Sequence, residues 1–469
     1  MSTPASVISS VDLATRFGTP DYIVFAGMLT VSAAIGIYYA CSGSKQSTTK
    51  EFLMGDRSMS VFPVSISVLA SFMSAITLLG TPAEVYQYGT QFWMICLCFF
   101  ITMPLAAYCY LPVFYNLGVT SVYEYLEKRF SLTVRIIGSV IFVVETMMYL
   151  ALVLYAPSLA LFQVSGLSTY SISRKQKTIW INLLGGFIII TATCFAGLII
   201  YSRYHECDPI TAGLVNAPDQ LLPLFMMDVL GYLPGLPGLF VSGVFSAALS
   251  TLSSAINSLA AVTLEDIIKT CIKKDVSELW AIRITKGLAL LYGVITILLV
   301  AVVQLLGDIL QAAWSFNGIL GGPLLGLFTL GMFCPWANSK GAVSGLLCGL
   351  ALSSWIGLGS FVYKPDAPKS PVSIGGCLTN VTLSPTYDPR HNENILVIYR
   401  LSYVWFTIIS IFFVLFSGII ISLLTGKSDP GCMDPKLITP VFDTFCRWLP
   451  PSVLSKLGLP VGHKMSNVG

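Results

Sequence analysis

Long apolar runs, each about as long as a lipid bilayer is thick, recur along this chain of 469 residues. A helix needs about 20 predominantly apolar residues to cross the ~30 Å hydrocarbon core of a membrane. Because only helices and closed barrels satisfy their backbone hydrogen bonds in lipid, we interpret each run as a membrane-spanning helix. The sequence predicts about ten such helices, near residues 22–42, 62–80, 92–113, 133–163, 179–201, 236–262, 283–306, 315–334, 341–362 and 401–425.

The composition excludes a soluble protein and a nucleic-acid-binding protein. Hydrophobic residues make up 55% of the chain and charged residues 10%, against about 25% charged residues in soluble domains. The net charge of +3 provides no basic stripe, and no spacing of cysteines and histidines matches a zinc site. All three histidines lie in polar segments, and no nucleophile and base are paired, so an enzyme is not expected. The sequence therefore predicts an all-α integral membrane protein.

The polar segments indicate how the chain is divided. We expect residues 1–21 to form an extracellular N-terminus, residues 22–425 the transmembrane domain, and residues 426–469 a cytoplasmic tail. Cys207 and Cys377 fall in the two longest polar loops of the second half, and Asn380 begins an Asn-Val-Thr glycosylation pattern. We expect both loops to be extracellular, where the two cysteines can form a disulfide.

A stripe of hydroxyl groups lies inside the apolar run at 236–262. On a helical wheel one narrow face carries small polar residues, which are Ser246, Ser250, Ser253, Ser254 and Asn257, flanked by Thr251 and Ser258. Small hydroxyl residues commonly allow membrane helices to pack closely. Hydroxyl and backbone carbonyl oxygens also bind hard cations at discontinuous membrane helices. The stripe alone leaves both interpretations open.

A second apolar run, VLASFMSAITLLGTPAEVYQYG at residues 68–89, also carries small polar residues. They are Ser71, Ser74 and Thr77. The segment GTPAE at residues 80–84 contains glycine and proline, so the helix is expected to break there. A break earlier in the run leaves no mark in the composition, because no glycine or proline lies within residues 64–79.

Three long motifs stand in order along the chain. FLMGDRSMSVFPVSISVLASFMSAITLLGTPAEVYQYG occupies residues 52–89, GVTSVYEYLEKRF residues 118–130, and LPGLPGLFVSGVFSAALSTLSSAINSLAAVTLEDI residues 233–267. In sequence and spacing they resemble the sodium/solute symporter family, more narrowly its sodium-dependent monocarboxylate and multivitamin branch. The resemblance implies the inverted-repeat transporter fold of the amino-acid/sodium symporter type, which binds ion and substrate near mid-membrane.

The resemblance also implies a sodium site between the first and the eighth core helix. Its ligands would be the backbone carbonyls of Ala70, Met73 and Ala247 and the hydroxyls of Ser250 and Thr251. A site built from neutral oxygens suits Na⁺, because an unpaired carboxylate at this depth costs several kcal/mol.

The implied substrate positions are less polar than those of sugar-carrying relatives. Thr77 and Cys96 stand where such relatives have strongly polar side chains, which favours a small organic anion over a sugar. Ser74 and Thr77 can bond a carboxylate or cap their own helix backbone, and the sequence leaves both open. No organic cofactor is expected, and the expected partners are Na⁺ as coupling ion, the organic anion and the lipid bilayer.

A few charged residues lie in or near the apolar runs. Glu145 is either a functional candidate or one half of a structural pair with a tyrosine or arginine. Asp308 lies near a helix end and is expected to be accessible to water. A short surface helix is expected to expose a solvated charged face made of Glu124, Glu127, Lys128 and Arg129.

The chain departs from the family pattern after Ser173. There the family continues with three more helices, whereas this chain passes through RKQK directly to QKTIWINLLGGF. The gap, near residues 173–177, removes the last two helices of the first repeat and the first helix of the second. That last helix is the discontinuous partner of the run at 68–80 and helps to gate and bind substrate in the family.

An odd number of missing helices creates a conflict over orientation. Basic residues favour cytoplasmic placement of residues 43–57, 173–177 and 269–286. With ten alternating spans the first of these lies opposite the other two, and the loops of Cys207 and Cys377 fall inside. Either one apolar run does not span the membrane, or the chain is a shortened isoform or gene model that does not insert like its parent. The leading expectation for function is a multi-pass plasma-membrane symporter of a small organic anion, and the alternative is a transport-inactive shortened isoform that acts as a regulatory partner of the full-length carrier.

Overall fold

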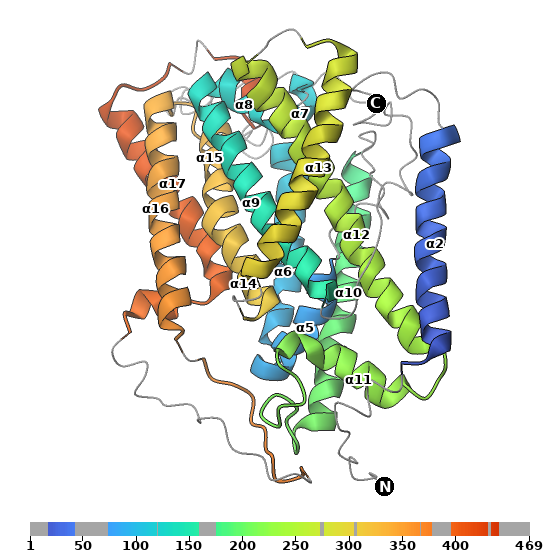
Figure 1. Cartoon of the computed structure of the whole chain (residues 1–469). Coiled ribbons are helices and arrows are strands. Elements are labelled where there is room, and N and C mark those ends of the chain that lie inside the picture. Colours follow the sequence, from blue (N-terminus) through green and yellow to red (C-terminus); the bar gives the residue numbers. More distant parts are fainter. Residues whose placement is uncertain are drawn as a thin grey trace.

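The structure is a computed structural model that describes residues 17–42, 74–119, 121–158, 175–272, 276–303, 307–365, 367–377, 395–429 and 433–439. Within these residues all regular structure is helical, as predicted, and most helices run side by side in one bundle (Figure 1). The α-helices are α2 (Thr19–Ser42), α5 (Ala75–Tyr88), α6 (Ile95–Leu105), α7 (Leu111–Leu117), α8 (Val122–Arg129), α9 (Leu132–Ser158), α10 (Lys175–Tyr204), α11 (Leu221–Leu230), α12 (Leu236–Val262), α13 (Glu278–Val303), α14 (Ile309–Phe316), α15 (Gly322–Phe333), α16 (Ser339–Tyr363) and α17 (Phe406–Leu424).

Shorter 3₁₀ and π segments extend or join these helices. They are η2 (Thr90–Met94), η3 (Ala106–Tyr110), η4 (Pro218–Gln220), η5 (Thr263–Ile272), η6 (Asn317–Gly321), η8 (Val397–Arg400), η9 (Tyr403–Trp405) and η11 (Pro435–Leu437). The π segment η5 continues α12 toward one end of the bundle, and η6 joins α14 to α15 within one span.

Eight helical segments of the described chain are long and apolar enough to cross a membrane. They are Thr90–Leu117, Leu132–Ala156, Asn182–Tyr204, Leu236–Ile272, Glu278–Val303, Ile309–Phe333, Ser339–Tyr363 and Tyr403–Leu424, and each overlaps one expected span. Of the other two expected spans, 22–42 coincides with α2. The span expected at 62–80 falls mostly outside the described residues, and its described part is the start of α5.

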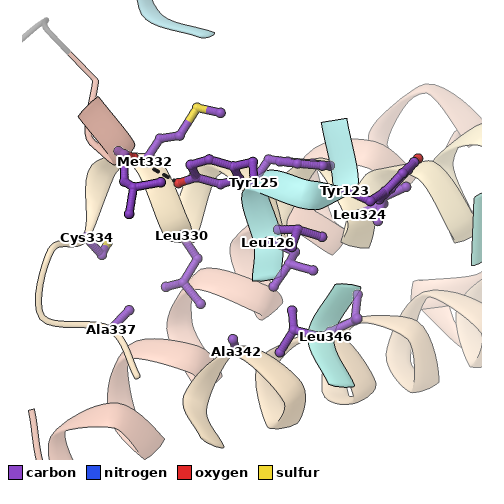
Figure 2. Packing of buried hydrophobic residues seen from close by; sticks show 14 of the residues in the cluster. Tyr123, Tyr125, Leu126, Leu324, Leu330, Met332, Cys334, Ala337, Ala342 and Leu346 are labelled. Atoms are coloured by element: carbon purple, nitrogen blue, oxygen red, sulfur yellow. Dashed lines mark hydrogen bonds between the residues drawn. The ribbon is translucent and has the colours of Figure 1, made fainter. Parts of the chain in front are cut away.

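The largest buried cluster ties α8 to α15 and α16 at the upper end of the bundle in Figure 1 (Figure 2). Tyr125 and Leu126 of α8 are fully buried there with Leu330 of α15 and Leu346 of α16. The hydroxyl of Tyr125 donates a hydrogen bond to the backbone carbonyl of Leu437, 3.1 Å away. The short helix α8 is therefore part of the core and not a loosely attached surface element.

The helices α9 and α10 follow each other in the chain but run in the same direction (Figure 1). Both begin toward the upper end in that view. The last turns of α9 pack with Ile309 at the start of α14, and α10 ends at Tyr204, in a cluster with Tyr86 near the end of α5. The start of α10 therefore lies at the same end as η5 and the start of α13.

This shared direction removes the assumption on which the orientation conflict rests. The conflict follows from strict alternation of the spans, and α9 and α10 do not alternate. The start of α10 and the segment η5 lie at the upper end, and the loops of Cys207 and Cys377 lie at the lower end. Residues 43–57, the third basic segment, lie outside the described residues.

Candidate functional site

The helix α5 begins at Ala75, inside the run where the sequence indicates no break. Ser74, the residue before it, is buried and has an extended backbone with φ −78° and ψ 166°. The break expected at residues 80–84 is wrong, because α5 continues through Pro82 to Tyr88. Gly80 serves close packing instead: a side chain there would lie 2.7 Å from Cβ of Leu310.

The first turn of α5 packs against the middle of α12. Ala75 lies in one buried cluster with Val244 and Ala248 of α12. Ala248 directly follows Ala247, one of the residues whose carbonyl is a predicted sodium ligand. The structure therefore brings the start of α5 beside the part of α12 that carries the predicted site.

The predicted ligands on α12 lie on successive turns of one face. The hydroxyl of Thr251, which is buried, donates a hydrogen bond to the carbonyl of Ala247 at 3.2 Å, and Ser250 is half-buried. A hydroxyl that donates its proton keeps its lone pairs, and a carbonyl oxygen has a second lone pair, so both oxygens can still bind a cation. The other two predicted ligands, Ala70 and Met73, lie outside the described residues.

The three predicted substrate residues are not all in one place. Ser74 is hydrogen-bonded to Tyr149 of α9, and Thr77 is half-buried on the next turn of α5. Cys96 is fully buried in a cluster with Val85 and residues of α10, and its thiol is hydrogen-bonded to Thr191. The structure thus places Ser74 and Thr77 at the start of α5, and Cys96 against α10.

Glu145 lies on α9 beside the π segment η6. Its carboxylate touches Gly321, where a side chain would have no room. The neighbours of Glu145 are Gly321 and, somewhat further away, Tyr123. Among the described residues no arginine forms the structural pair with Glu145 that the sequence left open. Glycine at this position of η6 is what allows the carboxyl group to lie within the bundle.

Three carboxylates gather at the lower end, although no sequence pattern links them. Glu84 of α5 accepts hydrogen bonds from Tyr403 at 2.8 Å and from Gln311 at 3.3 Å. Asp219 of η4 and Asp308, directly before α14, lie close enough to influence each other's charge. These residues come from distant parts of the chain, so no local spacing could have revealed the group.

Two of these carboxylates, Asp219 and Asp308, lie outside the membrane spans, and burial is the largest cause of the shift in their pKa values. Asp219 is almost fully buried and accepts a hydrogen bond from the backbone N–H of Ile309 at 3.1 Å. Burial raises its pKa to about 7. Asp308 is half-buried, so it is less accessible than expected, and burial raises its pKa while the charge of Lys369 and a hydrogen bond with Gln87 oppose the change.

Acidification is expected to stabilise the folded chain near neutral pH. The folded state keeps a proton on Asp219 up to a pKa of about 7, whereas the unfolded chain releases it near the ordinary carboxyl value. The free energy of unfolding falls as pH rises between these values and levels off above the folded pKa, which amounts to about 1.4 kcal/mol from about pH 6 to about pH 8 for this group. Thermal unfolding in nanodiscs at both pH values measures the change.

The variant Asp219→Asn is expected to lose this part of the pH dependence, because an amide does not titrate. The matched control is Asp434→Asn, which replaces an exposed aspartate that accepts a backbone hydrogen bond from Lys436. Equal pH dependence in wild type and Asp219→Asn would contradict the assignment of the proton to Asp219.

An ion-pair network joins α8, α9 and η5 at the upper end. Arg135 of α9 pairs with Asp266 of η5 and with Glu127 of α8. Asp266 is fully buried and also accepts a hydrogen bond from Ser121. Because η5 continues α12, the network fixes the upper end of the helix that carries the hydroxyl stripe.

Arg129 corrects the expectation of a fully solvated face on α8. Its side chain is buried, and its guanidinium donates hydrogen bonds to the carbonyls of Gly331, Cys334, Pro335 and Ala337. Carbonyls at the end of a helix such as α15 lack partners within the helix, and a guanidinium carries enough donors for several of them. The other charged residues of α8 follow the expectation and are at least partly exposed.

The two long polar loops meet at the lower end of the bundle. Cys207 and Cys377 form a disulfide, the pairing that the sequence allows. Around it, Ser373 accepts a hydrogen bond from the backbone of Asp208 at 2.9 Å and donates one to His205 at 2.7 Å. The segment after α10 and the segment after α16 are thus joined by both covalent and hydrogen bonds.

Glycosylation of Asn380 is expected, because its loop lies at the end opposite the basic connectors. Asn380 itself lies outside the described residues, shortly after Cys377 in the sequence. An Asn380→Gln variant is expected to lose the mass of one glycan on a gel, since only a lumenal loop meets the transferase. The same loss on treatment of wild type with a glycosidase is the control, and wild type without a glycan in microsomes would speak against extracellular placement.

Comparison with known proteins relates the chain to transporters. Residues 52–202 and 169–349 match the model of the Sodium:solute symporter family. Sodium-coupled monocarboxylate transporter 1 of Mus musculus is 37% identical over 544 aligned positions, which cover 89% of each chain. Sodium-coupled monocarboxylate transporter 2 of Mus musculus is 35% identical over 547 positions, with 92% of this chain and 88% of that protein covered. A putative sodium-dependent multivitamin transporter of Drosophila melanogaster is 36% identical, with 87% of each covered.

These alignments are longer than the 469-residue chain, so each of the three relatives carries residues that have no counterpart here. A solved structure of a Na⁺-coupled sialic acid symporter, in a substrate-bound outward-open state, matches with a TM-score of 0.65 at 19% identity. The match covers 88% of this chain and 99% of that one. At this identity the likeness concerns the fold, and it confirms the predicted inverted-repeat architecture.

Proposed function

Because this chain belongs to the sodium:solute symporter family, we propose that it carries a Na⁺ site between the start of α5 and the middle of α12. We further propose that the site serves symport of a small organic anion, a monocarboxylate or vitamin-type acid, across the plasma membrane. The family and the relatives are sodium-coupled transporters and not enzymes, and the chain is a multi-pass membrane protein.

The observation that carries the sodium site is that α5 and α12 are in contact, with Ala75 and Ala248 in the same buried cluster. It brings a helix start inside the bundle next to the turn that offers the oxygens of Ala247 and Thr251. In transporters of this kind unwound backbone carbonyls and helix C-terminal ends bind the cation, and the predicted carbonyl ligands Ala70 and Met73 stand in the sequence directly before the start of α5. Neutral oxygens at this depth suit Na⁺, because they avoid the cost of an unpaired carboxylate.

The substrate class is supported by the relatives and by the moderate polarity around the start of α5. Two relatives are named for monocarboxylates and one for vitamins, and their identity to this chain is similar. Ser74 and Thr77 offer hydroxyl groups that can donate hydrogen bonds to a carboxylate. Sodium and substrate would each raise the affinity for the other, since coupling between two sites is reciprocal.

The alternative function is a transport-inactive form that acts as a regulatory partner of the full-length carrier. The longer alignments favour it, because they show that this chain lacks residues present in transporters. The parallel course of α9 and α10 favours it too, because consecutive spans of an intact chain alternate in direction. Both functions require the sodium-site residues to be present, but only the first requires uptake.

Sodium binding by the chain itself tests the shared part of both proposals. We expect the unfolding temperature of the purified chain in nanodiscs to be higher in sodium chloride than in choline chloride, because a ligand of the folded state stabilises it. The double variant Ser250→Ala/Thr251→Ala is expected to lose this difference. Ser258→Ala is the matched control, because Ser258 lies on the same helix and is bonded only to Ser254 among the contacts that the structure gives.

A wild-type chain with equal unfolding temperatures in both salts would contradict the sodium site.

The substrate class is tested with a version in which the missing helices are restored. Unlabelled short monocarboxylates and vitamin acids are expected to compete with uptake of a labelled monocarboxylate, and a neutral sugar is not. Competition by the sugar and not by the acids would contradict the substrate assignment.

A further inference from the structure

The carboxylate of Asp21, at the start of α2, lies under the first turn of α12. One oxygen accepts hydrogen bonds from the backbone N–H groups of Gly235 and Gly238, each at 3.0 Å, and the other accepts one from Gly18 at 3.0 Å. Asp21 is 2% exposed although it is charged and lies near a chain end. A buried carboxylate of another helix thus caps α12, where unpaired N–H groups and the helix dipole favour a negative charge.

Glycine is required where the two helices meet. A side chain at Gly238 would overlap the backbone carbonyl of Asp21, and its Cβ would lie 2.7 Å from Cα of Asp21. Gly235, just before α12, has a left-handed backbone with φ +88°. The first turn of α12 therefore fits the start of α2 backbone to backbone, which leaves little freedom for α12 to slide along its axis.

Further along, the buried residues in the cluster between α2 and α12 lie on one face of α12. Phe25 meets Phe245 edge to face, with ring centroids 5.4 Å apart, and Val241 completes the cluster. With 3.6 residues per turn, Gly238, Val241 and Phe245 share one face of the helix. Ala247, Ser250 and Thr251 point to the opposite face on the same wheel. The helix α2 thus holds α12 from behind the predicted sodium ligands.

We propose that Asp21 is a positioning residue for the sodium site: through the first turn of α12 it sets the depth and rotation at which Ala247, Ser250 and Thr251 meet the start of α5. The inference rests on the proposed sodium site. The helix α2 precedes the first core helix of the family fold, so its role here is to support the ion site from outside the repeats.

The test measures equilibrium binding of radioactive Na⁺ to the purified 469-residue chain in nanodiscs, at constant ionic strength with choline. Asp21→Ala is expected to raise the dissociation constant for Na⁺ about fivefold. The reason is that the loss of this helix cap lets the first turn of α12 move and so weakens the sodium site on the same helix. Asp21→Asn keeps an oxygen that can accept the same N–H bonds and is expected to stay within about twofold of wild type. Asp434→Asn, which alters an exposed aspartate that accepts a backbone hydrogen bond from Lys436 and takes no part in the contact between α2 and the first turn of α12, is expected to match wild type.

A purely structural cap would give a different result. In that case Asp21→Ala lowers the unfolding temperature in choline but leaves the dissociation constant for Na⁺ unchanged, and this result would overturn the proposal. If Asp21→Ala does not fold, Phe25→Leu loosens the same contact without touching the carboxylate, and an unchanged dissociation constant there has the same meaning.

Failure of the proposed function is distinguishable from failure of this inference. Wild type that binds no Na⁺ overturns both. Wild type that binds Na⁺, with binding abolished by Ser250→Ala/Thr251→Ala but unaffected by Asp21→Ala, keeps the sodium site and removes only the positioning role of Asp21.

Discussion

The 469-residue chain is expected to show negligible sodium-driven uptake, whereas a version with the three family helices restored after Ser173 is expected to transport. The resemblance to the family implies that the absent segment includes the discontinuous partner of α5, which is expected to form one wall and a gate of the substrate cavity. A ligand shifts an equilibrium only by its differential affinity for two states. Without the helix that differs between the two states, binding of Na⁺ cannot favour one state over the other, so it cannot drive uptake.

Surface delivery of the short form is also expected to be poor. The described end of α9 and the start of α10 lie toward opposite ends of the bundle, with residues 159–174 between them in the sequence. Consecutive spans of ordinary membrane proteins are joined at one side of the membrane, so this junction is unfavourable for insertion.

The experiment expresses both forms in the same cells and measures surface label and tracer uptake in sodium and in choline medium. Uptake normalised to surface label separates poor delivery from a transport defect. Robust sodium-dependent uptake by the short form would show that the remaining helices rebuild a pathway, and the account of the gap would be wrong.

Loss of the hydroxyls on α12 is expected to weaken Na⁺ before it affects substrate. In the restored version, Thr251→Ala or Ser250→Ala should raise the sodium concentration for half-maximal uptake, because each removes a proposed oxygen ligand, expected to be worth ~1–3 kcal/mol. This corresponds to roughly a fivefold to hundredfold change. Thr251 is expected to show the larger effect, because it is the more deeply buried of the two.

The control for this experiment is Ser258→Ala, a serine on the same helix that is bonded to the carbonyl of Ser254 at 3.0 Å. It is expected to leave the sodium dependence unchanged. At saturating sodium, the substrate concentration for half-maximal uptake should change little in the Ser250 and Thr251 variants. An unaltered sodium dependence in both single variants and in the double variant would remove these residues from the site.

The sequence predicts the spans well because hydropathy over about 20 residues reflects a single physical requirement, the burial of backbone in lipid. It predicts the position of the helix break poorly. The glycine and proline at 80–84 suggested a break, but Gly80 and Pro82 lie within α5, and the helix begins after Ser74. The contact that accompanies this start, the hydrogen bond between Ser74 and Tyr149, joins distant parts of the chain and leaves no local signal.

The burial of charged residues is equally hard to predict from the sequence. A charged residue at the end of a short surface helix is usually solvated, and this rule holds for Lys128 but not for Arg129. The carbonyls that bind Arg129 follow α15, far along the chain, so only the folded structure could reveal them. Asp21 is similar, because its partners on α12 are likewise remote in sequence.

The orientation conflict arose because every neighbouring pair of spans was expected to be antiparallel. The pair α9 and α10 is the exception. The start of α10 and η5 lie at one end of the bundle, as their basic residues predict, and the placement of residues 43–57 stays a prediction.

The disulfide between Cys207 and Cys377 closes a ring of covalent bonds around the segment from α11 to α16, since the two cysteines are 170 residues apart in sequence. A single cut of the backbone within that ring leaves two pieces that separate only after reduction. The ring also has a mechanical meaning. The chain leaving α10 and the chain following α16 are held together at the lower end, and the backbone hydrogen bond from Ser370 to Gln87 adds the end of α5. Any widening of the bundle at this face must therefore move these three segments together, because the disulfide and the hydrogen bond hold them at a fixed separation.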